Sequence, residues 1–359
     1  MNSAVWTVPR VFMGRTRTKD LIGEVLSRLR ALLRGRVLRL LALVIMVYAL
    51  VVFVIVPRPK RQHLQHRGSV LESDLPTRVQ ACSTSLPGQR STHGQARMQL
   101  YDRLGAEVVR KGVPALDGST SSSSTQGLQL SDLFSFDEGK IIPHLTRLET
   151  AVRAIVVPFQ EADVKIIHQS VVSALEQVLG TGAVWYQDPK MYHANVWHAS
   201  HHKDPQPASA EEVDDEAASV AAVARAACEM EVVLERIVFT PGGVLIACWQ
   251  VASGTDPAQL RRTLRARLPR SPQVQMLSEE VILHSTLARI LKLLPGKDPA
   301  ASVATLTHTA EELSHTLCGL RLTLSQLWFV EEFDLLALAL GGGFSKRILP
   351  LECAVPPEI

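Results

Sequence analysis

Apolar residues return every three or four positions along several stretches of the chain, which is the spacing of an amphipathic helix. The clearest stretch is 159–180, where valine, isoleucine and leucine fall on one stripe and Gly180 follows as a stop signal. The same spacing predicts helices over 217–235, 256–268 and 301–317.

Shorter apolar runs between these stretches predict strands. Residues 236–253, RIVFTPGGVLIACWQVAS, form two such runs around a Pro-Gly-Gly turn, which predicts a β-hairpin. Further extended segments are expected at 182–200 with a break at Pro189, at 281–291, 321–331 and 335–340, and up to Leu351. Helices and strands alternate, and the C-terminal strands connect as hairpins. An α+β domain with antiparallel sheets is therefore expected.

One apolar stretch has no polar face. Residues 40–56, LLALVIMVYALVVFVIV, carry no charge, and at about 1.5 Å per residue they cover most of a hydrocarbon core of about 30 Å. We expect a single transmembrane helix over 40–57 that contacts the lipid bilayer through 40–56. Basic residues dominate 1–39, so the positive-inside rule places this segment in the cytosol and the C-terminal domain in a lumen, a type II topology. An Arg-rich, acid-poor start is also typical of transit peptides, which leaves an organelle membrane as an alternative.

Residues 58–136 are predicted to link the membrane helix to the folded domain. They are polar and small, and include the run GSTSSSSTQG at 118–127. Such a composition buries too little apolar surface to offset the entropy of ordering, so a flexible Ser-rich stalk is predicted. The folded, functional domain is then expected at 137–359.

Composition excludes some classes of protein. A formal net charge of +3 over 359 residues is not the strongly basic balance of a general nucleic-acid binder. The cysteines are widely spaced, odd in number and without a CxxC pair, which predicts neither a disulfide framework nor a zinc finger. They are expected to be buried small hydrophobes or inert thiols: Cys82, Cys228, Cys248, Cys318 and Cys353.

Four histidines crowd into YHANVWHASHH at 192–202. In a strand, side chains alternate between faces, so Tyr192, His198 and Ser200 would share one face and His193 would take the other. The pattern of one imidazole and one hydroxyl two residues apart recurs at His284 and Thr286.

Two such pairs that face each other make a phosphodiester site. One neutral imidazole takes a proton from water, and the opposed protonated imidazole donates to the leaving oxygen. The hydroxyls of Ser200 and Thr286 hydrogen-bond the non-bridging phosphate oxygens, where negative charge accumulates. This chemistry needs no metal and no cofactor.

The bare H-x-[ST] pattern also occurs at His144-Leu-Thr146 and His168-Gln-Ser170. His168 lies in the predicted helix, where residues two apart do not share a face, and His144 follows Pro143 at what reads as a helix start. We set both aside. A metal site is the rival interpretation of the histidine cluster, since His198 and His202 are four apart. The strand-forming residues around them count against it.

Two charged segments have plain interpretations. RRTLRARLPR at 261–270 suggests contact with RNA phosphates, but a leucine stripe leaves its arginines mostly on a solvated helix face. Glu331 and Glu332 could place a carboxylate beside an imidazole, although solvation at a strand edge explains the pair as well.

The motifs resemble those of a known family. HSTLAR at 284–289 is similar to the second signature of the 2H phosphoesterases, H-x-[ST]-L-A-R, and WHASHH at 197–202 is similar to the first. With LWFVEEFDLLALAL at 327–340, they most resemble plant and algal proteins of the RNA ligase/cyclic nucleotide phosphodiesterase family. The resemblance covers about residues 140–353, without the predicted anchor and stalk, and the acidic loop 203–216 departs from compact bacterial members.

The resemblance implies a bilobal fold of two antiparallel-sheet lobes around a central cleft. It implies that His198 and His284 are the acid–base pair and that Ser200 and Thr286 bind phosphate. Substrate contacts are expected from Tyr192, His202 and Arg289, with Arg289 on the face opposite His284.

The expected substrates are 2′,3′-cyclic or 1″,2″-cyclic phosphates of nucleotides or RNA ends. RNA end-joining, 3′-trimming exonuclease activity and a non-catalytic nucleotide- or RNA-binding module remain the alternatives.

Overall fold

The computed structural model describes residues 86–114, 116, 127–294 and 296–354, all within one compact unit, Asp74–Ile359. The basic segment 1–39 and the predicted membrane helix 40–57 lie outside the described residues. Within the described ranges, no helix is both long and apolar enough to cross a membrane.

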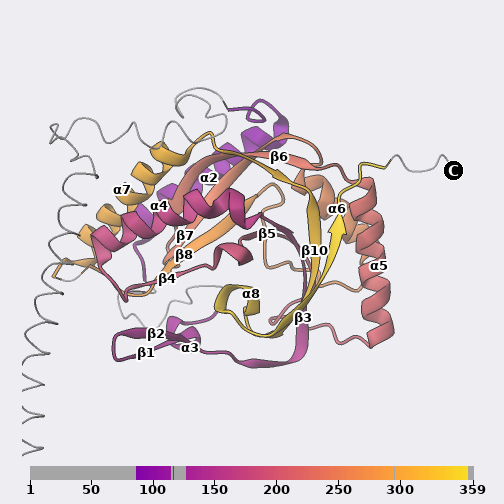
Figure 1. The fold of residues 1–359 in the computed structure, drawn as a ribbon, viewed down its shortest axis with the longest axis horizontal. Helices are drawn as coiled ribbons and strands as arrows, with labels where there is room; N and C mark the ends of the chain where they lie inside the picture. The colour runs from indigo at the N-terminus through magenta and orange to yellow at the C-terminus, as the bar shows by residue number, and fades with distance from the viewer. Residues whose placement is uncertain (1–85, 115, 117–126, 295, 355–359) are drawn as a thin grey trace, which may run out of the picture. The chain divides into compact units, whose positions relative to one another are not determined.

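Two antiparallel sheets and a small hairpin carry the fold (Figure 1). The four-stranded sheet has the order β11-β10-β3-β5: Phe344–Pro350, Gln326–Asp334, Arg147–Pro158 and His193–Ser200. The five-stranded sheet has the order β4-β8-β7-β6-β9: Val184–Tyr186, His284–Ile290, Val244–Ser253, Met230–Phe239 and Arg321–Leu324. The hairpin is β1-β2, Phe134–Asp137 and Lys140–Pro143. The expectation of an α+β fold with antiparallel sheets is confirmed.

Helices flank these sheets (Figure 1), and their ends carry recognisable start and stop signals. The acidic first turn of α4 favours its N-terminus through the helix dipole, and Gly180 ends the helix with a positive φ of 72°. In α6 and α7 an aspartate N-cap precedes a proline at the first turn. The longer helices are α2 (Thr92–Lys111), α4 (Glu161–Leu179), α5 (Ala210–Ala226), α6 (Pro257–Arg267) and α7 (Pro299–Leu317). The short ones are α3 (Leu130–Leu133), α8 (Ala337–Leu340) and the 3-10 turn η1 (Pro189–Met191).

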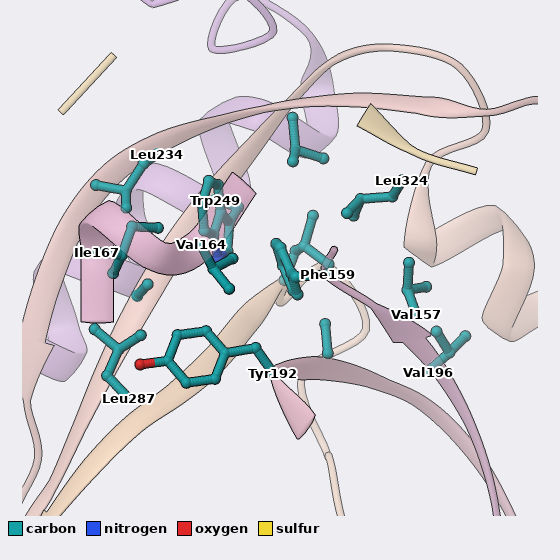
Figure 2. Packing of buried hydrophobic residues seen from close by; sticks show 14 of the residues in the cluster. Val157, Phe159, Val164, Ile167, Tyr192, Val196, Leu234, Trp249, Leu287 and Leu324 are labelled. Carbon is teal, nitrogen blue, oxygen red and sulfur yellow. The ribbon is translucent and has the colours of Figure 1, made fainter. Parts of the chain in front are cut away.

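One large core joins residues of both sheets with helices α4, α5, α6 and α7. Figure 2 shows part of it, where Tyr192 and Val196 from the β5 region lie with Trp249 and Leu287 from the other sheet. Removing such side chains from water stabilises the fold by about 1.5–3 kcal/mol each. The two sheets therefore form one cooperative unit.

The predicted helices at 159–180, 256–268 and 301–317 are confirmed as α4, α6 and α7, and the hairpin at 236–253 is confirmed as β6-β7. The helix predicted over 217–235 is wrong in its bounds. A capping box of Ser209 and Glu212 starts α5 within the acidic loop 203–216, and the chain turns into β6 at Met230.

The strand predicted at 335–340 is wrong, because this segment is a turn followed by α8. Leu336 adopts a left-handed conformation with φ 54°, which breaks the extended chain. The Glu332 carboxylate then accepts the Leu338 backbone N–H at 2.7 Å. Likewise, His144 does not open a helix but lies between β2 and β3.

The stalk prediction over 58–136 is wrong where the structure describes this segment. Helix α2 packs against β6 and β7 through a stripe that includes the buried Leu100, Tyr101 and Val108. Its mean composition is polar because the other face is solvated, so a composition argument does not find it. The folded domain therefore begins well before residue 137.

The expectation that the cysteines form no disulfide is also wrong. Cys228, just before β6, is bonded to Cys353 near the end of β11, and Cys318 is disulfide-bonded as well. The backbone N–H of Cys353 donates to the Ala227 carbonyl at 2.9 Å, which holds the tail beside α5. A separation of 125 residues hides this pairing in the sequence. Cys248 is a buried free thiol, as expected.

Candidate active site

Strands β5 and β8, which carry the two H-x-[ST] motifs, come from different sheets and contact each other. A cavity of about 100 Å³ opens beside them, bounded also by β3, β10 and the segment around α8. Its polar lining gathers side chains from three strands and two connecting segments: Gln187, His193, Asn195, His198, His201, His202, Thr286, Arg289 and Glu332. We call it the histidine pocket.

A β-bulge decides which side chains of β5 enter the histidine pocket. The register with β3 shifts between Asn195 and Trp197, so Val196 is an extra residue. Val196 and Trp197 follow each other but both pack into the large core. The bulge reverses the alternation, so His193 and Asn195 line the same pocket as His198. The prediction that His193 faces away is wrong for this reason.

A second register shift separates His198 from Ser200. His198 lies opposite Ala154 and Ser200 opposite Arg153, which are neighbours on β3 and point to opposite faces. Ser200 is fully buried, does not line the pocket, and accepts the Gln206 backbone N–H at 3.0 Å. The prediction that His198 and Ser200 share one face is wrong.

Strand β8 has a matching bulge. Ile246 pairs with Thr286 but Leu245 pairs with Ala288, so Leu287 is the extra residue. Leu287 and Ala288 both enter the large core, and beyond them Arg289 returns to the side of Thr286. Both line the histidine pocket. Arg289 is therefore not on the opposite face, as simple alternation predicts.

His284, at the start of β8, is half-buried and lies at the edge of this arrangement rather than in the lining of the pocket. Burial lowers the pKa of both His284 and His198, and the nearby His193 adds to both shifts. The two predicted catalytic histidines are thus linked through a third that strand alternation assigns to the wrong face.

Burial and like charges keep these imidazoles neutral. Desolvation lowers the pKa of His198 to about 3, and neighbouring histidine rings contribute to the same shift. Burial and the nearby Arg261 guanidinium lower the pKa of His284 to about 4. His198 and His201 meet edge to face, with ring centroids 5.9 Å apart. At neutral pH both predicted catalytic rings are therefore unprotonated in the free protein.

Glu332 is the carboxyl group of this pocket. It is 8% exposed, and burial raises its pKa to about 7, a shift that the hydrogen bond from Leu338 N–H partly opposes. Solvation at a strand edge therefore does not describe Glu332, whereas its neighbour Glu331 faces away and accepts a hydrogen bond from Ser345. Burial on β10 therefore leaves the Glu332 carboxyl group partly protonated near neutral pH.

Gln275 is a functional candidate that the motifs do not reveal. β5 is an edge strand, and the Gln275 carboxamide completes it: Oε1 accepts the His198 N–H at 2.8 Å and Nε2 donates to the His198 carbonyl at 3.0 Å. In the same loop, the Ser271 hydroxyl accepts a hydrogen bond from Trp197 Nε1 at 3.0 Å. The Val274 carbonyl oxygen lies 2.9 Å from His201 Nε2. The loop fixes the backbone that presents His198.

Arg261 holds the β5 bulge from behind. Its guanidinium donates to the Val196 carbonyl at 3.1 Å and to the Asn195 carbonyl at 2.9 Å, and a third bond reaches the Glu280 carbonyl at 2.5 Å. It is 4% exposed, so the interpretation of this arginine as part of a solvated face is wrong. The leucine stripe of this helix could not predict that Arg261 donates hydrogen bonds to the backbone carbonyls of the β5 bulge.

Two of the three predicted substrate contacts line the histidine pocket and one does not. Arg289 and His202 line the histidine pocket, but Tyr192 is 1% exposed and packs in the large core (Figure 2), with its hydroxyl 3.3 Å from His168 Nδ1. Tyr192 therefore does not face the site. Among the described residues, no three His, Cys, Asp or Glu side chains are placed to hold a metal ion.

No protein-family model matches the sequence, and no curated protein matches it. The chain is similar to the crystal structure of TT0787 of Thermus thermophilus, at 16% identity and a TM-score of 0.37, over 56% of this chain and 98% of that one. It is also similar to the crystal structure of the conserved protein of unknown function ATU0111 from Agrobacterium tumefaciens, at 14% identity and a TM-score of 0.42, over 66% of this chain and 97% of that one. Likenesses this distant carry no functional argument.

Proposed function

We propose that this protein is a phosphoesterase of the 2H type that hydrolyses cyclic phosphodiesters of nucleotides or RNA ends. In this proposal the two sheets are the two lobes, and each supplies one H-x-[ST] strand. The observation that supports it best is the contact between β5 and β8, beside a pocket lined by His198, Thr286 and the buried Arg289.

The size and charge of the histidine pocket suit one anionic group. A volume of about 100 Å³ is well below the roughly 300–1,000 Å³ of pockets that enclose whole ligands. Arg289 supplies a buried positive charge, and Thr286 a hydroxyl donor, to the non-bridging oxygens. Ser200 is replaced in this role by Arg289, because Ser200 is fully buried and does not line the pocket.

Hydrolysis then follows from the protonation states. One neutral imidazole of the His198–His284 pair accepts a proton from water as the water oxygen bonds to phosphorus. The bond from phosphorus to one ribose oxygen breaks, and the other imidazole gives that oxygen its proton. The negative charge of the bound phosphodiester favours the protonated ring and raises its pKa from the low value set by burial. Substrate polarity decides which histidine is base and which is acid.

Glu332 adds a group that can carry a proton at neutral pH. Its pKa of about 7 lets it donate a hydrogen bond to a phosphate oxygen while protonated, and makes it repel that oxygen once ionised. Since kcat/KM reports the pKa values of the free enzyme, a loss of activity above pH 7 is expected from Glu332 rather than from the histidines.

The proposal is tested by incubating the full-length protein with nucleoside 2′,3′-cyclic phosphates and a 1″,2″-cyclic phosphate in the presence of EDTA. Opening of one of these rings to a monoester supports it. Ligation of RNA ends, or trimming of 3′ nucleotides with intact cyclic phosphates, would move the assignment to an alternative activity of the same motifs. Binding of the whole panel without turnover would favour a nucleotide-binding module.

A further inference from the structure

A second cavity, of about 500 Å³, lies next to the histidine pocket. Gln187, Leu338 and Ala339 line both, so the two share one wall. It is bounded by β4, η1 and the turn from α8 into β11. Its volume is within the range of roughly 300–1,000 Å³ found for small-molecule sites.

The shared wall is built to stay in place. Gln187 Nε2 donates to the Leu338 carbonyl at 2.8 Å, and Trp185 Nε1 donates to the Ala339 carbonyl at 2.9 Å. These two bonds fasten α8 to the end of β4. The distance between the cavities is therefore set by the fold and not by a free loop.

Four aromatic or imidazole rings are part of the lining of the second cavity: His168, Trp185, Tyr186 and Phe344. Planar aromatic ligands stack on such rings, and each base stacked on an aromatic side chain is worth about 1–3 kcal/mol. Among the described residues, no arginine or lysine lines this cavity, and Asp188 is the one acidic residue in its wall. A second phosphate is therefore disfavoured there.

Tyr186 contributes its ring to this cavity and not its hydroxyl group. Its hydroxyl oxygen is buried and has no hydrogen-bond partner among the described residues, which costs free energy unless something else satisfies it. A heterocycle in the cavity would therefore stack on the rings that line it without reaching this oxygen.

We propose that this second cavity binds the nucleobase of a nucleotide whose phosphate occupies the histidine pocket. The inference rests on the proposed function only in taking a nucleotide as the ligand. It explains how a pocket too small for a nucleoside can select one: the phosphate binds in one cavity and the base in the next.

The test is calorimetric binding of a nucleoside 3′-monophosphate and of inorganic phosphate to the full-length protein. The nucleotide is expected to bind at least tenfold tighter than phosphate. Tyr186→Ala and Phe344→Ala, which each remove a ring from the lining, are expected to weaken nucleotide binding by tenfold or more, while phosphate binding stays unchanged. Phe136→Ala, which removes a ring that is 44% exposed on β1, is the matched control.

Equal affinity for nucleotide and phosphate would overturn the inference, as would nucleotide affinities unchanged in both variants. Phe344→Ala keeps the test decisive if Tyr186→Ala lowers the melting temperature. Because binding does not need turnover, the two proposals fail separately. An inert protein that shows the expected binding pattern loses the hydrolysis proposal and keeps this one.

Discussion

Burial keeps His198 uncharged, and this lowers the stability of the folded protein at acidic pH. The folded protein holds the pKa of His198 at about 3, whereas an exposed histidine in the unfolded chain titrates near 6.5. Between these values the unfolded chain binds the extra proton, so His198 removes stability as the pH falls below 6.5.

Replacing His198 with glutamine should remove that acid sensitivity. As the pH is lowered from 6.5 to 4, the free energy of unfolding of His198→Gln is expected to exceed that of the wild type by about 1.4 kcal/mol more for each pH unit. Urea unfolding at pH 7 and pH 4.5 measures the difference. Parallel pH dependences of the two proteins would show that the ring is not buried as a neutral base.

Glu332 has the opposite pH dependence. Its folded pKa of about 7 lies above the usual 4.5, so its stabilising effect is complete below about pH 4.5 and is lost as the pH rises through 7.

Glu332→Gln keeps an acceptor for the Leu338 N–H and should be more stable than the wild type at pH 8 by on the order of 1–3 kcal/mol. The same variant should lose the fall in kcat/KM above pH 7. Glu331→Gln, on the same strand but facing away, is the control for both measurements. A fall in kcat/KM that persists in Glu332→Gln would assign that limb to another group.

Val196 and Leu287 mark where inference from the sequence stops. The apolar run in each motif predicts a strand, and both strands exist, so the sequence was sufficient for the elements and for placing His198 and Thr286 in one site. Alternation alone could not locate a bulge, because an inserted apolar residue leaves the run apolar. Each bulge exchanges the faces beyond it, which brings His193 and Arg289 into the pocket and leaves Tyr192 in the core.

At the scale of elements, the loop 271–276 serves as the missing neighbour of an edge strand. Gln275 satisfies both backbone groups of His198, and buried groups left without partners cost about 1–3 kcal/mol.

Gln275→Leu is therefore expected to lower kcat by at least tenfold with a loss of stability of about 1–3 kcal/mol, because His198 loses its fixed backbone. Steady-state kinetics and thermal unfolding measure the two effects. Gln273→Leu changes an exposed residue of the same loop and should alter neither. Equal kcat values in the two variants would show that Gln275 does not position His198 for catalysis.

Helix α2 supports the second motif from the other side. The single hydrogen of the Tyr101 hydroxyl is shared between the carbonyls of Trp249 (2.9 Å) and Leu283 (2.8 Å), and its oxygen accepts the Leu283 N–H at 3.2 Å. This buried bridge joins β7 to the residue before His284. The sequence could not indicate it, because both partners are backbone atoms more than 140 positions away.

Tyr101→Phe keeps the ring and removes the bridge, so the free energy of unfolding should fall by about 1–3 kcal/mol. Chemical denaturation measures it, with the exposed Val109→Ala on the same helix as control. No loss of stability would indicate that α2 is not docked on the sheet in solution.

At the scale of the whole molecule, the Cys228–Cys353 disulfide ties the C-terminal segment to the start of β6. Disulfides persist in oxidising compartments, and the location of the domain in a lumen stays a prediction. Peptide mapping of native protein without reductant should recover the linked pair. Removing it by Cys353→Ser should cost about 2–5 kcal/mol, given the long loop that it closes.

The central claim is that His198 and His284 act on phosphorus together, and a comparison of histidine variants tests it most directly. Turnover of a nucleoside 2′,3′-cyclic phosphate should fall by at least 100-fold in both His198→Ala and His284→Ala, and should be unchanged in His144→Ala, which also fits H-x-[ST] but lies between β2 and β3. Wild-type turnover in either of the first two variants would contradict the account.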